Sequence, residues 1–428
     1  MKYLLAFLVL SVIIIVHELG HFIIAKASGV VVTEFSLGMG PRILKFTRKG
    51  TMYSIKLFFF GGSCRMLGEE EDDNSEGSFN SKSVWKRMAI IVAGPLFNFI
   101  FAFVLAVILI GKAGYDPCVV YSVNDNSAAY DAGLESGDHI VKINGKNINF
   151  YGDYSLYLIE HEGEVMDITY ERDGKKYTTT LVPEYIAEQE VYQMGVQMNA
   201  DTPTLYSVIE DTPAEKAGLQ KGDRILSING IEINITDEVS GAVQQSAGRE
   251  LTVVVERDGE EMTFTFTPEK VMNDAYYDMG MYMSAARVHG TPWETIKYSF
   301  KEVGYWIETV FKSFKFLFTG KASVNDVAGP VGIVTAIGDV VDESKSDGAM
   351  YVFLNLVNWS IMISANLGVM NLLPIPALDG GRLMFLIIEA VRRKPVPRDK
   401  EGMVHFVGIV LLMIIMVAVL FNDIRKLF

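Results

Sequence analysis

The stretch VIIIVHELGHFIIA, residues 12–25, combines two patterns that seldom occur together. His17, Glu18 and His21 have the spacing H-E-x-x-H. On a helix this spacing puts two imidazoles on one face, where they can bind zinc, with a carboxylate beside them. The flanking residues are apolar, and the run over residues 3–27 exceeds the roughly 18 residues that a membrane-spanning helix needs. The stretch therefore predicts a membrane helix that also carries a metal site.

Three further apolar runs are long enough to cross a membrane: residues 88–110, 351–391 and 404–421. The hydrophobic fraction of the 428-residue chain, 50%, is high for a soluble protein. A cleaved signal peptide is the alternative for the first run. One leading lysine, the length of the run and the lack of a prompt small-x-small site favour a retained span. We expect a polytopic α-helical membrane protein with about four transmembrane helices.

The loops between the runs differ in basic residues, which mark the cytoplasmic side. Residues 26–87 contain ten lysines and arginines, and residues 389–402 contain five. Both loops are therefore expected inside, with the N-terminus, the C-terminus and residues 115–350 outside the cytoplasm. Cys64 and Cys118 then lie on opposite sides of the membrane and cannot pair. The net charge of −14 argues against nucleic-acid binding.

The outside segment contains an internal repeat with an offset of 85 residues. AAYDAGLESGDHIVKINGK at 128–146 aligns with PAEKAGLQKGDRILSINGI at 213–231, and ERDG recurs at 171 and 256. The alternating HIVKING and RILSING stretches predict strands, and each ERDG predicts a hairpin turn. Each copy resembles a bacterial PDZ domain, a fold that holds peptide C-termini by strand addition. The alternative is a pair of spacer domains without a peptide ligand.

Residues 291–320 have apolar side chains at helical spacing with four lysines between them. These charges are too frequent for a fifth span, so an amphipathic helix on the outer membrane surface is expected. Packing against the repeat domains is the alternative.

A catalytic zinc needs a third protein ligand and an open position. His405, at the start of the last run, is one candidate. Asp379 is a better one, because Pro374 and Pro376 break the third run just before it, and an acid on broken backbone at membrane depth is a functional candidate. His17 lies roughly 21 Å from the outer end of its span at 1.5 Å per residue, which places the site in the cytoplasmic half of the bilayer.

These motifs resemble the site-2 protease family of M50-type zinc metalloproteases, in the form that regulates sigma E and carries tandem PDZ domains. VHELGH matches the family's first motif and NLLPIPALDGG, residues 371–381, its second. AGPLFNF at 93–99, AGPVGI at 328–333 and the membrane-associated β-loop GGSCRMLGE at 61–69 also resemble family signatures. In that loop Ser63 and Cys64 replace an aromatic and a β-branched residue.

The resemblance implies that His17, His21 and Asp379 bind Zn²⁺, that Glu18 is the general base, and that Asn371 contacts substrate. It implies peptide-bond hydrolysis in or near transmembrane segments, of an anti-sigma factor or of signal-peptide remnants, by a multi-pass protein of the bacterial inner membrane. The substrate helix must unwind, and residues 53–62 are predicted to offer it a strand edge.

The expected division of the chain has five parts. They are a first membrane half with the β-loop (1–114), two PDZ-like domains (115–200 and 201–288), a surface helix with a connector (289–350) and a second membrane half (351–428). Two alternatives remain: a non-proteolytic membrane scaffold whose metal is structural, and a metal transporter. A structural zinc usually has four protein ligands, and only three good candidates are present, which favours the protease over the scaffold. The spans also have few polar residues, which favours the protease over the transporter.

Overall fold

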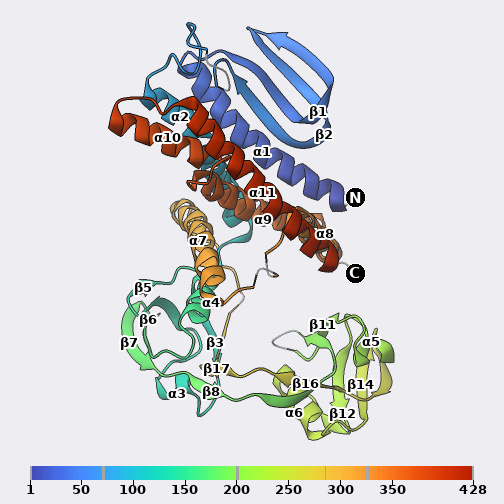
Figure 1. Ribbon diagram of the computed structural model, residues 1–428. Coiled ribbons are helices and arrows are strands. Elements are labelled where there is room, and N and C mark those ends of the chain that lie inside the picture. Colours follow the sequence, from blue (N-terminus) through green and yellow to red (C-terminus); the bar gives the residue numbers. More distant parts are fainter. Residues whose placement is uncertain are drawn as a thin grey trace. The chain divides into compact units, whose positions relative to one another are not determined.

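The computed structural model describes residues 2–69, 73–198, 202–284, 286–323, 325 and 327–426, without the side chains of residues 58–60, 237 and 398 (Figure 1). The chain forms two compact units. The first comprises Met1–Cys118, Asn149–Leu156 and Ala285–Phe428, and the second Val119–Ile148 and Tyr157–Ser284.

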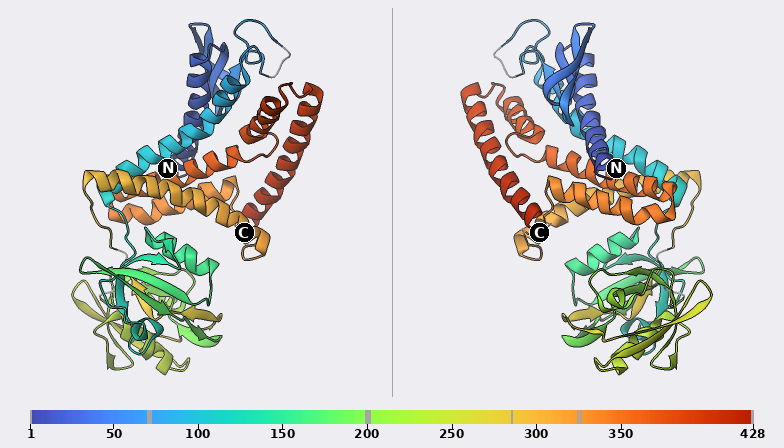
Figure 2. Two further views of the ribbon diagram at one scale, coloured as in Figure 1. Left: turned by 90° about the vertical axis from the view of Figure 1, so that its left-hand side faces the viewer. Right: turned by 90° about the vertical axis from the view of Figure 1, so that its right-hand side faces the viewer.

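Within the described residues, four helices are long and apolar enough to cross a membrane, as predicted. They are α1 (Lys2–Ala27), α2 (Val84–Ala113), α9 (Ala349–Leu372) and α11 (Arg398–Lys426). The third predicted run, residues 351–391, is two helices, because α10 (Asp379–Arg392) follows α9 only after a six-residue break. Pro374 and Pro376 cause the break, since proline donates no backbone hydrogen bond. At the red end of the chain in Figure 2, the short α10 and then the longer α11 follow α9.

Small residues bring these helices into close contact. A Cβ on Gly20 of α1 would lie 2.3 Å from the carbonyl oxygen of Ala93 in α2, so only glycine fits there. Ala102 and Ala106 of α2 are fully buried in the cluster that α2 forms with α9. Close backbone approach of this kind is how helices pack in lipid, where apolar burial gives no driving force.

Helix α7 (Pro292–Thr319) begins with a capping box of Thr291 and Glu294 and is not one of the candidate spans. Val303 is buried in the cluster of α2 and α9, whereas Trp293 and Phe300 are exposed. The apolar stripe predicted for the membrane surface is therefore partly covered by the first unit itself.

Helix α8 (Pro330–Ser344) begins in the AGPVGI stretch. The backbone N–H groups of Gly329 and Gly332 donate to the carboxylate of Asp423 in α11, at 2.9 and 2.8 Å. Asp423 thus caps α8 from another helix, and side chains at the two glycines would collide with it.

Strands β1 (Val32–Arg48) and β2 (Thr51–Met66) form an antiparallel hairpin, and the β-loop predicted at 61–69 begins in the last residues of β2. Both are bent, so residues 34–37 pair with 62–65 and also with 52–55. In this register residues 62–66 pair on one side only, so they form an edge of the sheet. The first part of the predicted edge, residues 53–55, is paired on both sides. Buried Glu34 accepts two hydrogen bonds from Arg42, and this pairing lowers its pKa to about 2.

The second unit contains the second copy of the repeat and most of the first. The strands predicted from HIVKING and RILSING and the hairpins predicted at both ERDG stretches are confirmed. The first copy has the sheet β5-β4-β6-β7 and the second β13-β12-β14-β15. The strands of the first sheet are β4 (His139–Ile143), β5 (Lys146–Asn147), β6 (Met166–Arg172) and β7 (Lys175–Leu181). Those of the second are β12 (Arg224–Ile228), β13 (Ile231–Glu232), β14 (Leu251–Arg257) and β15 (Glu260–Phe266).

One buried ion pair recurs in both copies. Arg172 donates two hydrogen bonds to Asp138, at 2.6 and 2.7 Å, and Arg257 bonds to Asp223 at the same distances. Both aspartates are fully buried and belong to the repeated Gly-Asp turns. In each copy the ion pair joins the Gly-Asp turn to the ERDG hairpin, which explains why these two motifs recur together in the sequence.

The copies exchange strands, which the repeat alone did not predict. Strand β10 (Val196–Met198), at the end of the first copy, pairs with β11 (Leu205–Val208) of the second. Its counterpart β18 (Met281–Met283) pairs with β3 (Val120–Val123) of the first. Strands β8 (Glu184–Ile186) and β9 (Gln189–Gln193) likewise pair with β17 (Tyr276–Asp278) and β16 (Glu269–Asn273). The domain boundary expected at 200/201 lies outside the described residues. The strands before and after it, β10 and β11, pair with each other.

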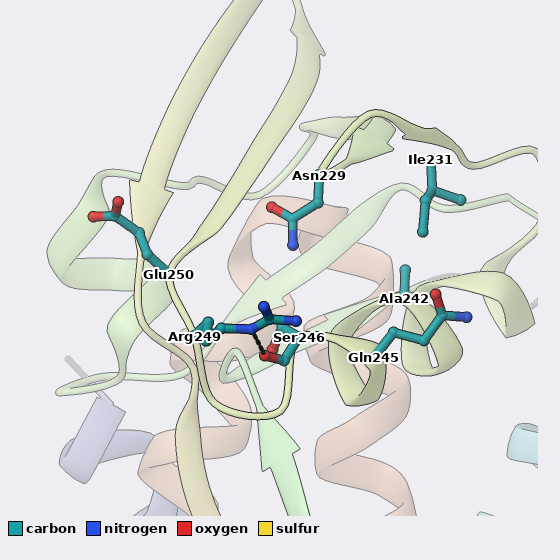
Figure 3. Close-up of a pocket in the computed structure, with 7 residues that line it drawn as sticks. All are labelled: Asn229, Ile231, Ala242, Gln245, Ser246, Arg249 and Glu250. Carbon is teal, nitrogen blue, oxygen red and sulfur yellow. Dashed lines mark hydrogen bonds between the residues drawn. The ribbon is translucent and has the colours of Figure 1, made fainter.

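The remaining helices of the copies are short. They are α3 (Ala128–Asp131), α4 (Tyr151–Glu160), α5 (Pro213–Ala217) and α6 (Thr236–Gln245). The first residues of α4 belong to the first unit, where Lys301 of α7 donates to the side chain of Asn149 at 2.6 Å. A cavity of about 360 Å³ lies at the end of α6, beside Asn229 and Arg249 (Figure 3).

Candidate metal centre

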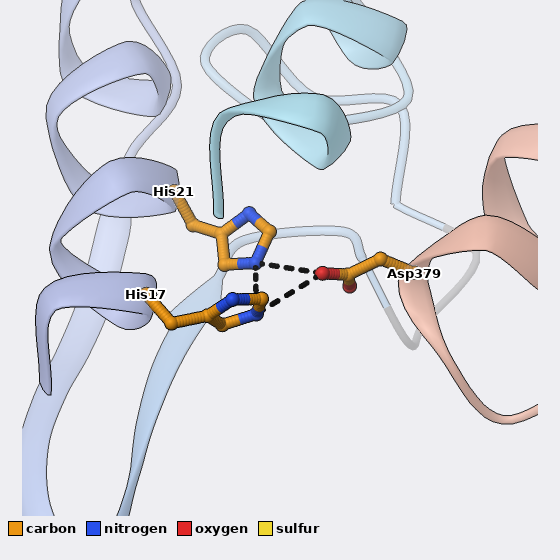
Figure 4. Close-up of side chains that lie close together, drawn as sticks. All are labelled: His17, His21 and Asp379. Carbon is orange, nitrogen blue, oxygen red and sulfur yellow. Dashed lines mark hydrogen bonds and ion pairs between the residues drawn. The ribbon is translucent and has the colours of Figure 1, made fainter. Parts of the chain in front are cut away.

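Three side chains from two distant segments converge in the first unit (Figure 4). His17 and His21 lie one turn apart on α1, and Asp379 is the first residue of α10. Asp379 Oδ2 lies 3.1 Å from His17 Nε2 and 3.2 Å from His21 Nε2, and the two Nε2 atoms are 3.2 Å apart. Among the described residues, these three form the one group of histidine, cysteine and acidic side chains spaced to hold a metal ion.

The triangle formed by these atoms has the size of one face of a zinc tetrahedron. Ligands at about 2.0–2.1 Å from zinc are separated by about 3.3 Å, close to the three observed distances. Both histidines are buried. Asp379 Oδ2 is also buried and has no hydrogen-bond donor among the described residues. The donor set therefore fits a zinc ion and leaves a fourth position open.

The outer nitrogen of each histidine is held by α2. His21 Nδ1 donates to the carbonyl oxygen of Ile90 at 2.8 Å, which directs Nε2 towards Asp379. His17 Nδ1 faces the side-chain amide of Asn98 at 3.3 Å. Asn98 is fully buried, and its Oδ1 has no partner among the described residues. Exchanging the amide N and O lets His17 Nδ1–H donate to Oδ1, the arrangement that a metal-binding imidazole needs.

Asn98 was not predicted as a site residue. It lies in AGPLFNF, but the sequence alone does not indicate which residue of α1 it meets. Gly94 in the same stretch lies against the site, because a Cβ there would be 2.3 Å from His21 Nε2.

Glu18 lines a pocket of about 250 Å³ together with His17, His21, Asp379 and the edge residues 63–66. The backbone N–H of Cys64 donates a hydrogen bond to the Glu18 carboxylate. Glu18 is therefore beside the three converging atoms but outside their triangle, as the H-E-x-x-H spacing predicts.

Asn371 and His405, the two other residues considered from the sequence, lie elsewhere. Asn371 is half-buried near the end of α9 and does not line the pocket. His405 is outside the metal-spaced group and accepts a hydrogen bond from the Ala377 backbone at 2.9 Å.

A larger cavity of about 750 Å³ adjoins this pocket. Glu69 and Arg382 line both spaces and form an ion pair with each other. Arg382 is one turn beyond Asp379, so the pair links α10 to the end of the β-loop. In the large cavity Arg87 pairs with Glu389, which links α2 to α10.

Comparison with known proteins was made on the whole chain. The model of peptidase family M50 matches residues 5–415. The regulator of sigma-W protease RasP of Bacillus subtilis is 31% identical over 442 residues, covering 99% of this chain and 98% of the relative. The regulator of sigma E protease of Haemophilus influenzae is 31% identical over 443 residues, covering 98% and 97%.

Among solved structures, the PDZ domain of HtrA3 with a phage-derived ligand is similar over 20% of this chain, with 23% identity and a TM-score of 0.18. The family model and both relatives agree with the family resemblance of the motifs. The chain therefore belongs to peptidase family M50, and the prediction of an intramembrane zinc metalloprotease is confirmed.

Proposed function

We propose that His17, His21 and Asp379 are the zinc ligands and that Glu18 is the general base of peptide hydrolysis. The observation that carries this proposal is the convergence of the three donor atoms at 3.1–3.2 Å beside the pocket that Glu18 lines. Zinc held there supplies a Lewis acid that polarises the scissile carbonyl and makes water nucleophilic at neutral pH. The open fourth position favours catalysis over a structural metal.

The side chains around the ligands have separate tasks. The Glu18 carboxylate takes the proton of the attacking water and returns it to the leaving amine. The Cys64 N–H holds Glu18 at the edge of the sheet, while the Ile90 carbonyl and Asn98 orient the two imidazoles.

Glu18→Gln tests the assignment of the base. The variant should retain zinc in the purified protein and lose cleavage of a model transmembrane segment, since glutamine cannot accept the proton. Loss of zinc would instead make Glu18 a ligand, and retained cleavage would refute its role as the base. Asp379→Asn, as the comparison, should lose both zinc and cleavage.

Residues 62–66 are proposed to hold the unwound substrate as an added strand. Their unpaired side faces the catalytic pocket, because the Cys64 N–H reaches Glu18 and residues 63–66 line the pocket. Asn371 is proposed to contact the substrate from the end of α9. Disulfide trapping tests the strand: in the Glu18→Gln background, a cysteine scanned along the substrate segment should form a disulfide with Cys64. Cys64→Ser should abolish it, and equal trapping by Cys118 would contradict the proposal.

The protein is further proposed to be a multi-pass protein of the bacterial inner membrane, with the site in the cytoplasmic half and the PDZ-like copies outside. The lysine and arginine bias of residues 26–87 and 389–402 supports this orientation. A membrane-impermeant thiol reagent applied to intact cells should label Asp173→Cys and spare Lys49→Cys. Both positions are exposed turn residues, and the reverse pattern would invert the topology.

The proposed substrates are single-span anti-sigma factors already trimmed outside, with signal-peptide remnants as the second class. The two relatives that are named as regulators of sigma factors support the first class. The PDZ-like copies would filter by size or read the new C-terminus. Tyr115 and Val288 already pair through their backbones at 3.1 and 2.8 Å, so residues 116–287 can be deleted between adjacent ends. The deletion should permit cleavage of untrimmed substrate, and an intact substrate would exclude a filter.

A further inference from the structure

The loop before Asp379 makes backbone hydrogen bonds from Ile375 to Leu373 and from Leu378 to Ile375, whereas the N–H of Ala377 bonds outside the loop. Between the end of α9 and the start of α10, Pro374 and Pro376 have no N–H group. Ala377 adopts a positive φ of 79°. Residues with a side chain rarely adopt this conformation, and it persists only where the surroundings impose it.

Two residues one turn apart on α11 contact this loop. His405 Nδ1 accepts the Ala377 N–H at 2.9 Å. Gly408 leaves room for Pro376, because a Cβ at Gly408 would lie 2.3 Å from the proline Cβ. Only 6% of the apolar part of α11 is buried, so these contacts are a small and localised part of the helix surface.

The hydrogen bond defines the state of the His405 ring. Since the amide donates to Nδ1, the neutral ring carries its proton on Nε2. This Nε2 is buried, has no hydrogen-bond partner among the described residues and lies 3.9 Å from Glu401. In the neutral ring the lone pair that could bind a metal is on Nδ1, and the Ala377 N–H already occupies it. His405 is also outside the metal-spaced group.

We propose that His405 is a positioning residue, which fixes Asp379 for zinc binding by holding the Ala377 backbone from the last helix. Ala377 is two residues before Asp379, and Leu378, between them, is the N-cap residue of α10. A rotation of the Ala377 peptide therefore moves the start of α10 and the carboxylate with it. The inference rests on the proposed role of Asp379 as a ligand.

The test compares two substitutions in the full-length protein. His405→Leu removes the acceptor at similar size, and His405→Asn keeps an acceptor oxygen near the position of Nδ1. Zinc retention against a graded chelator and the kcat and KM for a model transmembrane segment are measured for each. His405→Leu should release zinc at about 10- to 100-fold lower chelator and lose kcat to a similar extent, the usual range for an outer-shell partner. KM should change less than twofold, and His405→Asn should restore most of the zinc retention.

The control is Phe406→Leu, an exposed neighbour on the same helix, which should behave as the wild type. Wild-type zinc retention in His405→Leu would overturn the proposal. So would an equal loss in His405→Asn, which would indicate packing rather than the hydrogen bond. If His405→Leu does not fold, His405→Ala serves as the acceptor-free variant. Zinc retained by Asp379→Asn would refute the ligand assignment itself, so the two failures are distinguishable.

Discussion

Gly20→Ala should damage the proposed metal centre without replacing any of its three proposed ligands. The added methyl would lie 2.3 Å from the Ala93 carbonyl oxygen and 3.0 Å from the Cβ of Phe97. Ordinary contacts begin near 3.5 Å, so α1 and α2 must separate by about 1 Å. Overpacking of this kind costs about 1–3 kcal/mol, offset in part by the better helix propensity of alanine, about 1 kcal/mol.

The effect on activity should exceed the effect on stability. Separating α1 from α2 breaks the contacts of His21 with Ile90 and of His17 with Asn98, which orient the imidazoles. A displacement of about 1 Å at a catalytic group costs on the order of 100-fold in rate. Gly20→Ala should therefore lose about 100-fold in kcat and retain zinc less well.

Gly304→Ala is the matched control, because it is a glycine within helix α7 with nothing within 4 Å of the added Cβ. It should keep full activity and gain up to about 1 kcal/mol of stability. The assay is cleavage of a model transmembrane segment in detergent, with zinc measured on the same samples. Activity of Gly20→Ala within threefold of the wild type would refute the reasoning, as would an equal loss in Gly304→Ala.

Three further predictions concern single side chains. Asn98→Ala should lower kcat about 10-fold, because the His17 ring loses the side chain that orients it. Asn98→Asp should lower kcat less, since a carboxylate still accepts a hydrogen bond from Nδ1. Equal losses of kcat in the two variants would exclude the hydrogen bond. Glu34 has its pKa lowered to about 2 by Arg42, so it stabilises the fold above its unfolded pKa near 4.5 and loses this effect as pH falls towards 2. Thermal unfolding should show Glu34→Gln less stable by about 2 kcal/mol at pH 7 and equal near pH 2, and a constant difference would contradict the assignment. Burial raises the pKa of Glu302 to about 7, so its ionisation destabilises the fold increasingly between pH 4.5 and 7; Glu302→Gln should be more stable than the wild type at pH 8 and similar at pH 4.

Much of the site was predictable, because its elements are local in sequence. His17 and His21 share a helix face at any tertiary arrangement, and Glu18 is necessarily turned away from them. Asp379 was predicted from the two prolines before it and from the cost of an acid at membrane depth. Asn98 was not predicted, since an asparagine in an apolar helix gives no indication of its partner on another helix.

The sequence by itself determined the apolar helix lengths, the H-E-x-x-H spacing, the proline break and the two copies of the repeat. Each of these depends on residues a few positions apart, whose geometry the backbone sets. Only the tertiary structure decided which strand is the edge beside the site, that the copies exchange β10 and β18, and that α2 and α11 contact the segments with the proposed ligands. Apart from the β10–β11 pairing, these contacts join residues tens to hundreds of positions apart, and close packing and backbone pairing between whole elements select them.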